Sequence, residues 1–552
     1  MTAPRTLRTV PVAALLAFAL LAAGCGGTDG PGAAKTDGTV GRENKGIIET
    51  TDKAKPGGKI VYGLLSETNG WNPGTNQWSS SGLEVTRAIF DTLSAFDEKS
   101  QIHPNLAAGF EHNADYTQWT IKLRPNVKLH NGKPVTADVV VRNQTYLKKS
   151  AITGGAYTYT KAFTAKDDLT VVVDLVEPWA NYPMTLATQI GVVGDPDWME
   201  SNDSLHPIGT GPFSFDQWEI GSKLTVKKNA DYWRKDADGV SYPYLDGIEF
   251  RPITDGASRS AALRAKDIDI MLTNSGAQIT DFQKSDEFQI LSDPQGESDE
   301  TFIILNTQAP PFDDVDARRA LAYATDKNAV VEIMTEGFNE PADGPWGPTS
   351  PWYTRTDYPQ FDQAKARELV EKVKAKHGGT FSFALQGVAT PEQQKGQQLL
   401  QQQWKEVGID VELTTLEQTT MIITVVTGKY QAANWAQFGA QHPDLDGVWW
   451  SPELASAPPA FTLNFARLKD DEIGAAQKKG RAAADVQGQK DAVAVVQKRL
   501  AEDVPYVWLY HTKIGVISSP KLQNVANYTL PDGAKGLDLN EGAHPLFQIS
   551  LR

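Results

Sequence analysis

Cysteine is almost absent from this sequence, because Cys25 is the only one in 552 residues. A single cysteine cannot close an intrachain disulfide, and it cannot supply a cysteine-based zinc site or an iron–sulfur cluster. Basic residues are also in deficit, with 53 Lys and Arg against 68 Asp and Glu. Nucleic-acid-binding proteins need basic faces. We therefore expect no nucleic-acid partner.

Recognisable catalytic motifs are missing as well. The sequence has no His-Glu-x-x-His helix, no Gly-x-Ser-x-Gly elbow and no Walker-type phosphate loop. Its eight histidines are scattered and offer no visible set of metal ligands. We expect no metal, no cofactor and no enzymatic activity. A secreted hydrolase is the alternative, and it would show turnover that stops when one carboxylate is removed.

The first 24 residues have the pattern of a signal peptide. Arg5 and Arg8 precede the apolar run Val12–Leu21, and small residues follow it. This run is shorter than the roughly 20 residues that span a bilayer. The segment Leu21-Ala22-Ala23-Gly24-Cys25 resembles the lipobox of bacterial lipoproteins. The resemblance implies a lipidated Cys25 and an extracytoplasmic protein anchored to the outer face of the cell membrane; a non-lipidated secreted protein is the alternative.

Residues 25–57 are rich in Gly, Thr, Asp and Lys, which predicts a flexible tether between the lipidated cysteine and a folded body. The body is acidic, so it gains nothing from an anionic lipid surface. Any attachment to the membrane must therefore come from the lipid.

The body alternates short strands with amphipathic helices, more regularly after residue 300. This pattern predicts α/β lobes with partly parallel sheets. The strands are expected at 59–65, 119–123, 170–175, 213–219, 224–228, 301–306, 380–385, 409–414 and 505–510. The helices are expected at 82–96, 136–147, 315–324, 328–335, 364–376, 392–407 and 489–502.

Three blocks, in order, resemble the extracytoplasmic solute-binding proteins of ABC transporters, family 5, which bind peptides, dipeptides or nickel. The first runs from Asn105 to Asp138 and contains Trp119–Pro125 and a turn at Asn131-Gly132. The second joins Gly209-Thr210-Gly211-Pro212-Phe213 to Asn229-Ala230-Asp231-Tyr232-Trp233. The third runs from Leu305-Asn306-Thr307 to the helix Arg318–Lys327.

This resemblance implies a periplasmic-binding-protein type II fold, with two α/β lobes, a hinge and a ligand cleft between the lobes. We expect lobe I at 58–300, with a subdomain at about 85–205, lobe II at 301–504, and a return to lobe I at 505–552. The implied function is the substrate-binding subunit of an ABC importer. It would be a monomer that delivers an oligopeptide or similar solute to a permease and ATPase complex. A sensor lipoprotein that presents its ligand to a receptor is the alternative.

The same resemblance implies where the ligand sits. Family pockets use the loop after the first strand, the crossing between lobes, and a Trp-bearing strand and loop of lobe II. The corresponding residues here are Trp71, Asn72, Gln77, Trp78, Asn306 and Trp435, with the stretch that continues to Trp449-Trp450. Tryptophan faces cover varied side chains or sugar rings. Replacing Trp78 or Trp435 by Ala is expected to lower affinity with little loss of stability.

One departure concerns the ligand's amino terminus. Peptide binders of the family often place an Asp shortly after the lobe II Trp, and this position falls near Gly439. A buried ammonium needs a partner, so Asp444 or Asp446 would have to replace that carboxylate. Longer, blocked or cyclic peptides and oligosaccharides stay open as ligands. A metal chelate is a further alternative, with His442 as the histidine nearest the expected cleft.

Overall fold

The computed structural model describes residues 44–49, 54–201, 203–292, 299–438 and 440–552. The predicted signal peptide, Cys25, most of the predicted tether and Gly439 lie outside these residues. Within this part of the chain, no helix is long and apolar enough to cross a bilayer.

Lobe I is built on a seven-stranded mixed sheet. Strand β1 (Lys59–Leu64) lies near its centre and pairs in parallel with β10 (Gly247–Pro252) and β11 (Ile270–Thr273). The predicted hairpin is β8 (Phe213–Glu219) and β9 (Lys223–Lys228), which pair antiparallel. The full order is β12 (Gln289–Ser292), β19 (Gly515–Ser518), β11, β1, β10, β9, β8. The strand predicted at 59–65 and the hairpin are confirmed.

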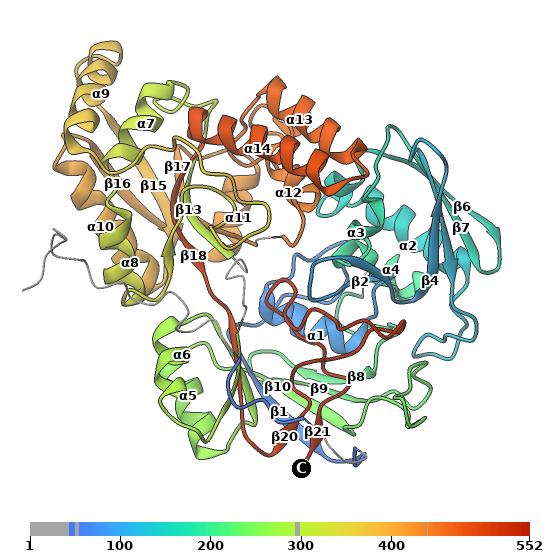
Figure 1. The fold of residues 1–552 in the computed structure, drawn as a ribbon. Helices are drawn as coiled ribbons and strands as arrows, with labels where there is room; N and C mark the ends of the chain where they lie inside the picture. The colour runs from blue at the N-terminus through green and yellow to red at the C-terminus, as the bar shows by residue number, and fades with distance from the viewer. Residues whose placement is uncertain (1–43, 50–53, 202, 293–298, 439) are drawn as a thin grey trace, which may run out of the picture. The chain divides into compact units, whose positions relative to one another are not determined.

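The subdomain carries its own antiparallel sheet of four strands, followed in Figure 1 by their blue-green colour. Their order is β4 (Ala107–His112), β5 (Gln118–Leu123), β7 (Thr170–Leu175), β6 (Thr160–Asp167). Helix α2 (Ala137–Lys149) begins where the sequence predicts, because the Thr136 hydroxyl caps it by accepting from the Val139 N–H. Alternate residues of β5 and β7 point into one apolar core that includes Trp119.

Lobe II is built on a six-stranded mixed sheet. Its order is β14 (Glu340–Pro341), β18 (Tyr506–Thr512), β13 (Asp299–Leu305), β17 (Ala432–Phe438), β15 (Ser382–Val388), β16 (Asp410–Leu416). Strand β13 is buried on both faces. Ile303 and Leu305 pack against α7 (Val315–Ala324), α9 (Gln363–Lys376) and α10 (Pro391–Lys405). Phe302 and Ile304 pack in a second core with α14 (Val486–Asp503).

The chain passes between the two large sheets twice. The first passage lies between β12 and β13, near residue 300. The second follows strand β18, later in the chain than the lobe boundary that we expect at 504/505. Strand β18 still pairs with β13 in lobe II, and only β19 joins lobe I, so the chain crosses between Thr512 and Gly515. The apolar strand near 505 completes lobe II because both of its faces are buried there.

Two further expectations need correction. The helix predicted at 82–96 is α1 (Ser80–Ile89), and the residues after its extended cap at Phe90 include strand β2 (Ser94–Phe96). The predicted tether is not free along its whole length. Lys45 pairs with Ile290 at the edge of lobe I, and the Ile48 N–H donates to Gln289 Oε1 at 2.7 Å. The apolar side chain of Ile47 explains this attachment, because it packs against the lobe I core.

Candidate functional site

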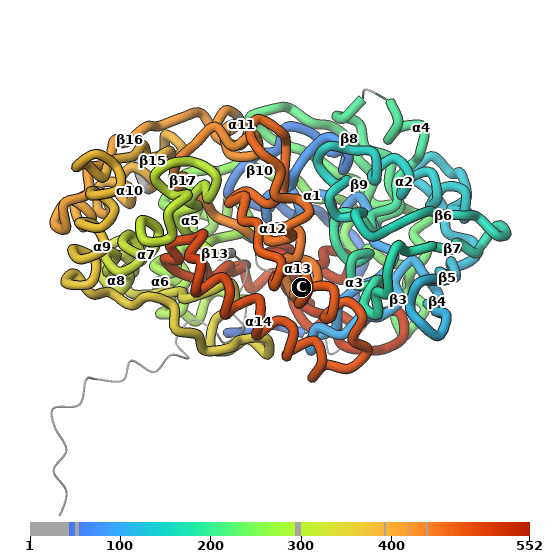
Figure 2. Tube along the Cα trace, turned by 90° about the horizontal axis from the view of Figure 1, so that it is seen from above, coloured from blue at the N-terminus to red at the C-terminus, as the bar shows by residue number. Residues whose placement is uncertain are grey.

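A cavity of about 1180 Å³, open solvent at its mouth included, lies between lobe II and the lobe I side of the molecule. The lobe II wall comes from α12 (Pro443–Trp450), the end of β17 and the loop after α12. The opposite wall comes from the loop before α1 and from the subdomain at residues 152–159 and 179–190. Figures 1 and 2 show α12 and α13 (Asp471–Ala482) next to the subdomain.

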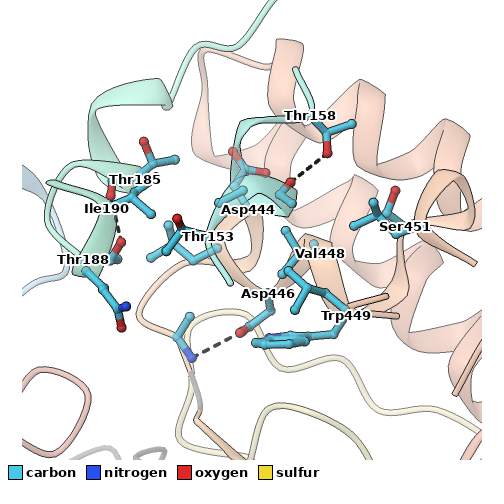
Figure 3. Close-up of a pocket in the computed structure, with 18 of the residues that line it drawn as sticks. Thr153, Thr158, Thr185, Thr188, Ile190, Asp444, Asp446, Val448, Trp449 and Ser451 are labelled. Carbon is cyan, nitrogen blue, oxygen red and sulfur yellow. Dashed lines mark hydrogen bonds between the residues drawn. The ribbon is translucent and has the colours of Figure 1, made fainter. Parts of the chain in front are cut away.

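The lobe I wall is continuous with the hydrophobic core. Trp78 is only 1% exposed, stacks on Phe90 with ring centroids 6.2 Å apart, and donates its indole N–H to the Gly70 carbonyl at 3.2 Å. Gln77, beside it, is exposed and lines the cavity. The subdomain adds Thr153, Thr188 and other residues with short side chains (Figure 3). This wall is therefore held in place by core packing, and few of its side chains are charged.

The lobe II wall carries most of the ionisable groups. Helix α12 begins after His442, whose Nδ1 accepts from the Asp444 N–H at 3.2 Å, while its Nε2 bonds to Gln489 Oε1 at 3.2 Å. Burial lowers the pKa of His442. This histidine therefore caps a helix as a neutral ring. Figure 3 shows Asp446, one turn into the helix, with the ring of Trp449 below it.

Asp446 is buried at 4% exposure, yet the protein gives it few partners. Its Oδ2 accepts from the Ala440 N–H at 3.3 Å, and the Trp449 side chain also hydrogen-bonds to it. Burial raises the pKa of Asp446 to about 8, and the nearby Glu541 carboxylate adds to the rise. Glu541 lines the same cavity, and burial raises its pKa too. Two carboxyl groups thus face the cavity in surroundings that disfavour their charge.

Asp444 has a different environment, although it lies only two residues away. Its Oδ2 accepts from the Trp179 indole N–H at 3.2 Å and from Asn181 Nδ2 at 3.4 Å, both in the subdomain. Close by, the Ala180 N–H donates to the Arg481 carbonyl at 2.7 Å. These bonds connect lobe II to the subdomain across the cavity. Asp444 therefore helps to hold the two walls together.

An ion-pair cluster strengthens the same closure. The Arg481 guanidinium lies 2.6 Å from Glu177 of the subdomain, and Lys478 lies 3.3 Å from the same carboxylate. The guanidinium also sits over the Tyr159 ring, 3.6 Å from its centroid. Arg481 lines the cavity, but its charge is already matched by Glu177. The structure thus has direct contacts between the walls around the space for a ligand.

Four of the predicted site residues line this cavity and four do not. Gln77, Trp78, Asp444 and Asp446 line it. Asn72 is 1% exposed and its side chain bonds to Met199, Gly74 and Tyr146 within lobe I. Asn306 is fully buried, and its Nδ2 donates to the carbonyls of Gly428 and Tyr430. Both amides hold loops in place.

Two tryptophans also lie elsewhere. Trp71 packs edge-on against Trp218 at 5.1 Å in the lobe I core. Trp435 is not among the residues that line the cavity; its ring lies 5.4 Å from the Phe465 ring, and its indole N–H donates to Gln437 Oε1 at 3.4 Å. Trp435 contacts the cavity only indirectly, because its hydrogen-bond partner Gln437 is one of the residues that line the cavity. That Trp71, Asn72, Asn306 and Trp435 bind ligand stays a prediction.

Sequence reasoning missed several lining residues. Trp179 comes from the subdomain, in a stretch with no matched motif, and Glu541 comes from the return segment at the end of the chain. Trp449 was named only as part of a longer stretch, although it lines this cavity and a second one behind it. A helical reading of Pro443–Trp450 would have placed Asp446 and Trp449 one turn apart on the same face.

No group of three or more His, Cys, Asp or Glu in the described part of the chain is arranged to hold a metal ion. His442, the histidine nearest the cavity, is already used as a helix cap. The described residues therefore provide no basis for binding a bare metal ion at this site.

Comparisons with known proteins agree on one family. The model of the bacterial extracellular solute-binding proteins, family 5 Middle, matches residues 101–456. The glutathione-binding protein GsiB of Pectobacterium atrosepticum is 27% identical over 461 residues, covering 81% of this chain and 87% of that protein.

Two solved structures have the same fold. DppA of Helicobacter pylori, in complex with the peptide STSA, superposes with a TM-score of 0.77 at 23% identity, covering 90% of this chain and 98% of DppA. AppA of Bacillus subtilis, in complex with a nonapeptide, gives a TM-score of 0.75 at 22% identity, covering 91% of this chain and 100% of AppA. DppA is described as a periplasmic binding protein, and the α/β fold of such proteins that the sequence led us to expect is confirmed.

Proposed function

Because the chain belongs to family 5 of the bacterial extracellular solute-binding proteins, it is a transport binding protein and not an enzyme, and we propose that it captures oligopeptides in the cavity between its lobes. Membership of this family makes it the extracytoplasmic substrate-binding subunit of an ABC importer for peptides or related solutes. In the proposal, the closed protein delivers its ligand to a membrane permease and ATPase complex.

The observation that carries the proposal is the cavity itself. Both lobes contribute to it, and its walls combine aromatic faces with amide and hydroxyl groups. Amides such as Gln77 and Gln437 can bond to peptide backbone, while Trp78 and Trp449 cover varied side chains. The ligands bound in the DppA and AppA structures are peptides, and GsiB is a binding protein for glutathione, itself a small peptide.

Closure provides the second line of support. A ligand shifts a two-lobed protein toward its closed form only through contacts that the open form lacks. Here Asp444 and Arg481 already join the walls directly, so part of the closed state is stabilised without a ligand. A peptide lying between α12 and the loop at Gln77 would add the remaining contacts. Micromolar affinity corresponds to about −8 kcal/mol.

Binding and closure can be tested together on the purified protein without residues 1–24. The tetrapeptide Ser-Thr-Ser-Ala should raise the melting temperature, bind in titration calorimetry and reduce the radius of gyration in solution scattering. Native mass spectrometry of freshly purified protein would identify any retained ligand. Failure of this peptide and of a mixed library of two to nine residues to bind would refute capture of peptides.

The lipid anchor is the other part of the proposal. Its support is the sequence before Cys25, with a basic start, an apolar run and small residues. Two or more acyl chains give lasting attachment to a membrane. In cells, the wild-type protein should fractionate with membranes, whereas Cys25→Ser should appear in the soluble extracytoplasmic fraction. Membrane retention of the Cys25→Ser variant would refute lipid anchoring and leave the binding function untouched.

A further inference from the structure

We propose that Gly155 is a positioning residue for closure: because it has no side chain, the subdomain and lobe II can meet directly beside the ligand cavity. This inference rests on the proposed function, because it concerns how the walls of that cavity come together. The contact defines a seam, by which we mean Gly155 and Tyr159 of the subdomain facing Ser451, Leu454 and Leu463 of lobe II. All five residues line the cavity.

The contact at Gly155 leaves no room for a side chain. A Cβ atom added there would lie 2.6 Å from Leu463 Cδ1, 3.4 Å from Leu463 Cγ and 3.9 Å from Leu454 Cδ1. Carbon atoms in contact prefer a separation of about 3.5–4.0 Å. Gly155 belongs to the 3₁₀ helix η1 (Gly154–Tyr157) of the subdomain, whereas both leucines belong to the connection that joins α12 to α13. The close approach therefore joins one wall of the cavity to the other.

The neighbouring glycine has a local role instead. A Cβ atom on Gly154 would lie 2.9 Å from the carbonyl oxygen of Lys148, near the end of α2 in the same subdomain. Neither Gly154 nor Gly155 has a positive φ. Steric contact, and not backbone strain, therefore decides which residues each position accepts. A side chain at 154 would disturb the packing inside the subdomain, whereas a side chain at 155 would push against lobe II.

The subdomain side of the seam is held in place by its own hydrogen bonds. Tyr157, two residues after Gly155, is 2% exposed, and its hydroxyl donates to Gln144 Oε1 of α2 at 3.0 Å. The Thr158 hydroxyl (Figure 3) donates to the Gly155 carbonyl at 2.7 Å. Helix η1 therefore cannot move away from lobe II without disturbing its bonds to the subdomain core.

The lobe II side of the seam is held in place as well. Asn464, the residue after Leu463, is fully buried. Its Nδ2 donates to the carbonyls of Ser451 and Leu468, at 3.0 and 2.9 Å. The Leu463 side chain itself packs against the core of lobe II. Because both sides are fixed, an atom added to Gly155 should be accommodated mainly by separation of the two walls.

A small separation of the walls is enough to weaken the other contacts of the seam. The Tyr159 hydroxyl lies 3.4 Å from Ser451 Oγ and 3.4 Å from Glu453 Oε2, near the upper limit for a hydrogen bond. The Arg481 guanidinium of lobe II stacks over the same ring, 3.6 Å from its centroid. A methyl group on Gly155 needs about 1 Å of additional space, which would lengthen all of these contacts together. Gly155 thus controls how completely the walls close.

The test is a double-mutant cycle across the seam. The peptide Ser-Thr-Ser-Ala is titrated into wild type, Gly155→Ala, Leu463→Ala and the double variant, and Gly155→Leu provides a larger obstruction. Gly155→Ala should lower affinity about fivefold and Gly155→Leu about 50-fold, because the closed form alone is overpacked. In the Leu463→Ala background, Gly155→Ala should cost less than about twofold, because the atoms that it meets are gone.

Two glycines of the same subdomain provide the controls. A Cβ atom on Gly109 meets nothing within 4 Å, so Gly109→Leu should keep the affinity of wild type. Gly154→Ala should lower the melting temperature more than Gly155→Ala does, and the folded protein should keep its affinity. Solution scattering without ligand should give a larger radius of gyration for Gly155→Leu than for wild type and Gly109→Leu. Circular dichroism confirms that each variant is folded.

The outcomes distinguish this inference from peptide capture. Equal affinity of wild type, Gly155→Ala and Gly155→Leu would overturn the role of Gly155 and leave peptide capture intact. A loss of affinity in Gly155→Ala that persists in the Leu463→Ala background would place its cause inside the subdomain and would also overturn the inference. If wild type binds no peptide, capture is refuted and scattering alone decides: a larger radius of gyration for Gly155→Leu supports the seam, and an unchanged one overturns it.

Discussion

The two walls of the cavity use similar side chains in different ways. On the lobe I wall, Trp78 is stacked on Phe90 and its N–H is satisfied by Gly70, so it belongs to the core as much as to the cavity. On the lobe II wall, Trp449 is half-buried and Asp446 lacks a cationic partner among the described residues. The lobe I wall thus supplies a fixed aromatic surface. The lobe II wall supplies a buried carboxyl group that lacks a cationic partner among the described residues. From this difference we expect ligand specificity to depend mainly on α12.

The largest effect should follow from breaking the lobe I wall. Trp78→Ala is expected to destabilise the protein by about 3–5 kcal/mol, because it removes a fully buried ring and leaves a cavity. This revises the expectation from sequence that the change would cost little stability. Urea denaturation measures the loss. A cost below about 1 kcal/mol would show that Trp78 is not part of the core.

The matching change on the lobe II wall should affect binding more than folding. Trp449→Ala is expected to lower affinity for the bound peptide at least tenfold and to cost under about 2 kcal/mol of stability, since the ring is only half-buried. Trp435→Ala is the control, because this ring does not line the cavity. Calorimetric titration should show the smaller loss for Trp435→Ala. The reverse order would place the ligand against Trp435.

Asp446 should also reveal itself in the pH dependence of stability. Its pKa is about 8 in the folded protein and near 3.8 when unfolded, so the folded state holds an extra proton between these values. The contribution of Asp446 to the free energy of unfolding therefore falls as pH rises from about 4 to 8. The stability advantage of Asp446→Asn over wild type should therefore grow between pH 5 and pH 9, by about 1 kcal/mol or more.

Melting curves from pH 5 to 9 test this prediction. Parallel curves for wild type and Asp446→Asn would contradict the raised pKa. Exposed Asp216 provides the control, because its pairing with Lys227 is on the surface of lobe I, so Asp216→Asn should leave the shape of the curve unchanged.

The smallest effect should come from loosening the contact between the walls. Glu177→Gln removes the charge that Arg481 and Lys478 share, but its amide oxygen can still accept from Arg481. We expect affinity to fall about threefold, because only the closed form loses this attraction. Added salt should reduce the difference. Without ligand, solution scattering should give a larger radius of gyration for Glu177→Gln than for wild type. An unchanged scattering profile would contradict a role of Glu177 in closure.

Regular elements were largely predictable from sequence. The helices at 315–324 and 364–376 and the strands near 59, 170 and 410 follow from apolar periodicity, and Thr136 marks the start of α2 as a capping residue. The helix predicted at 82–96 was too long. Its apolar run continues into the chain that leads to β2, and periodicity alone does not separate a helix from a following short strand.

The site was predictable only in outline. The sequence placed ligand contacts on α12, but Asp444 and Asp446 are identical residues two positions apart, and only the folded surroundings separate them. Glu541 reaches the cavity from a return segment with no motif of its own. Asn72 and Asn306 have the right chemistry for a peptide, but their buried amides bond to neighbouring loops instead. Tertiary contacts, which no single segment encodes, decided each case.

The second crossing of the chain has a consequence for the order of folding. Strand β19 lies between β12 and β11, one strand in from the edge of the lobe I sheet, although it is made of residues 515–518. During synthesis from the N-terminus, this sheet lacks an interior strand until nearly the whole chain has emerged. Such non-local pairing slows folding. The first lobe in sequence is thus the last to be completed, because its sheet gains an interior strand only when residues 515–518 are available.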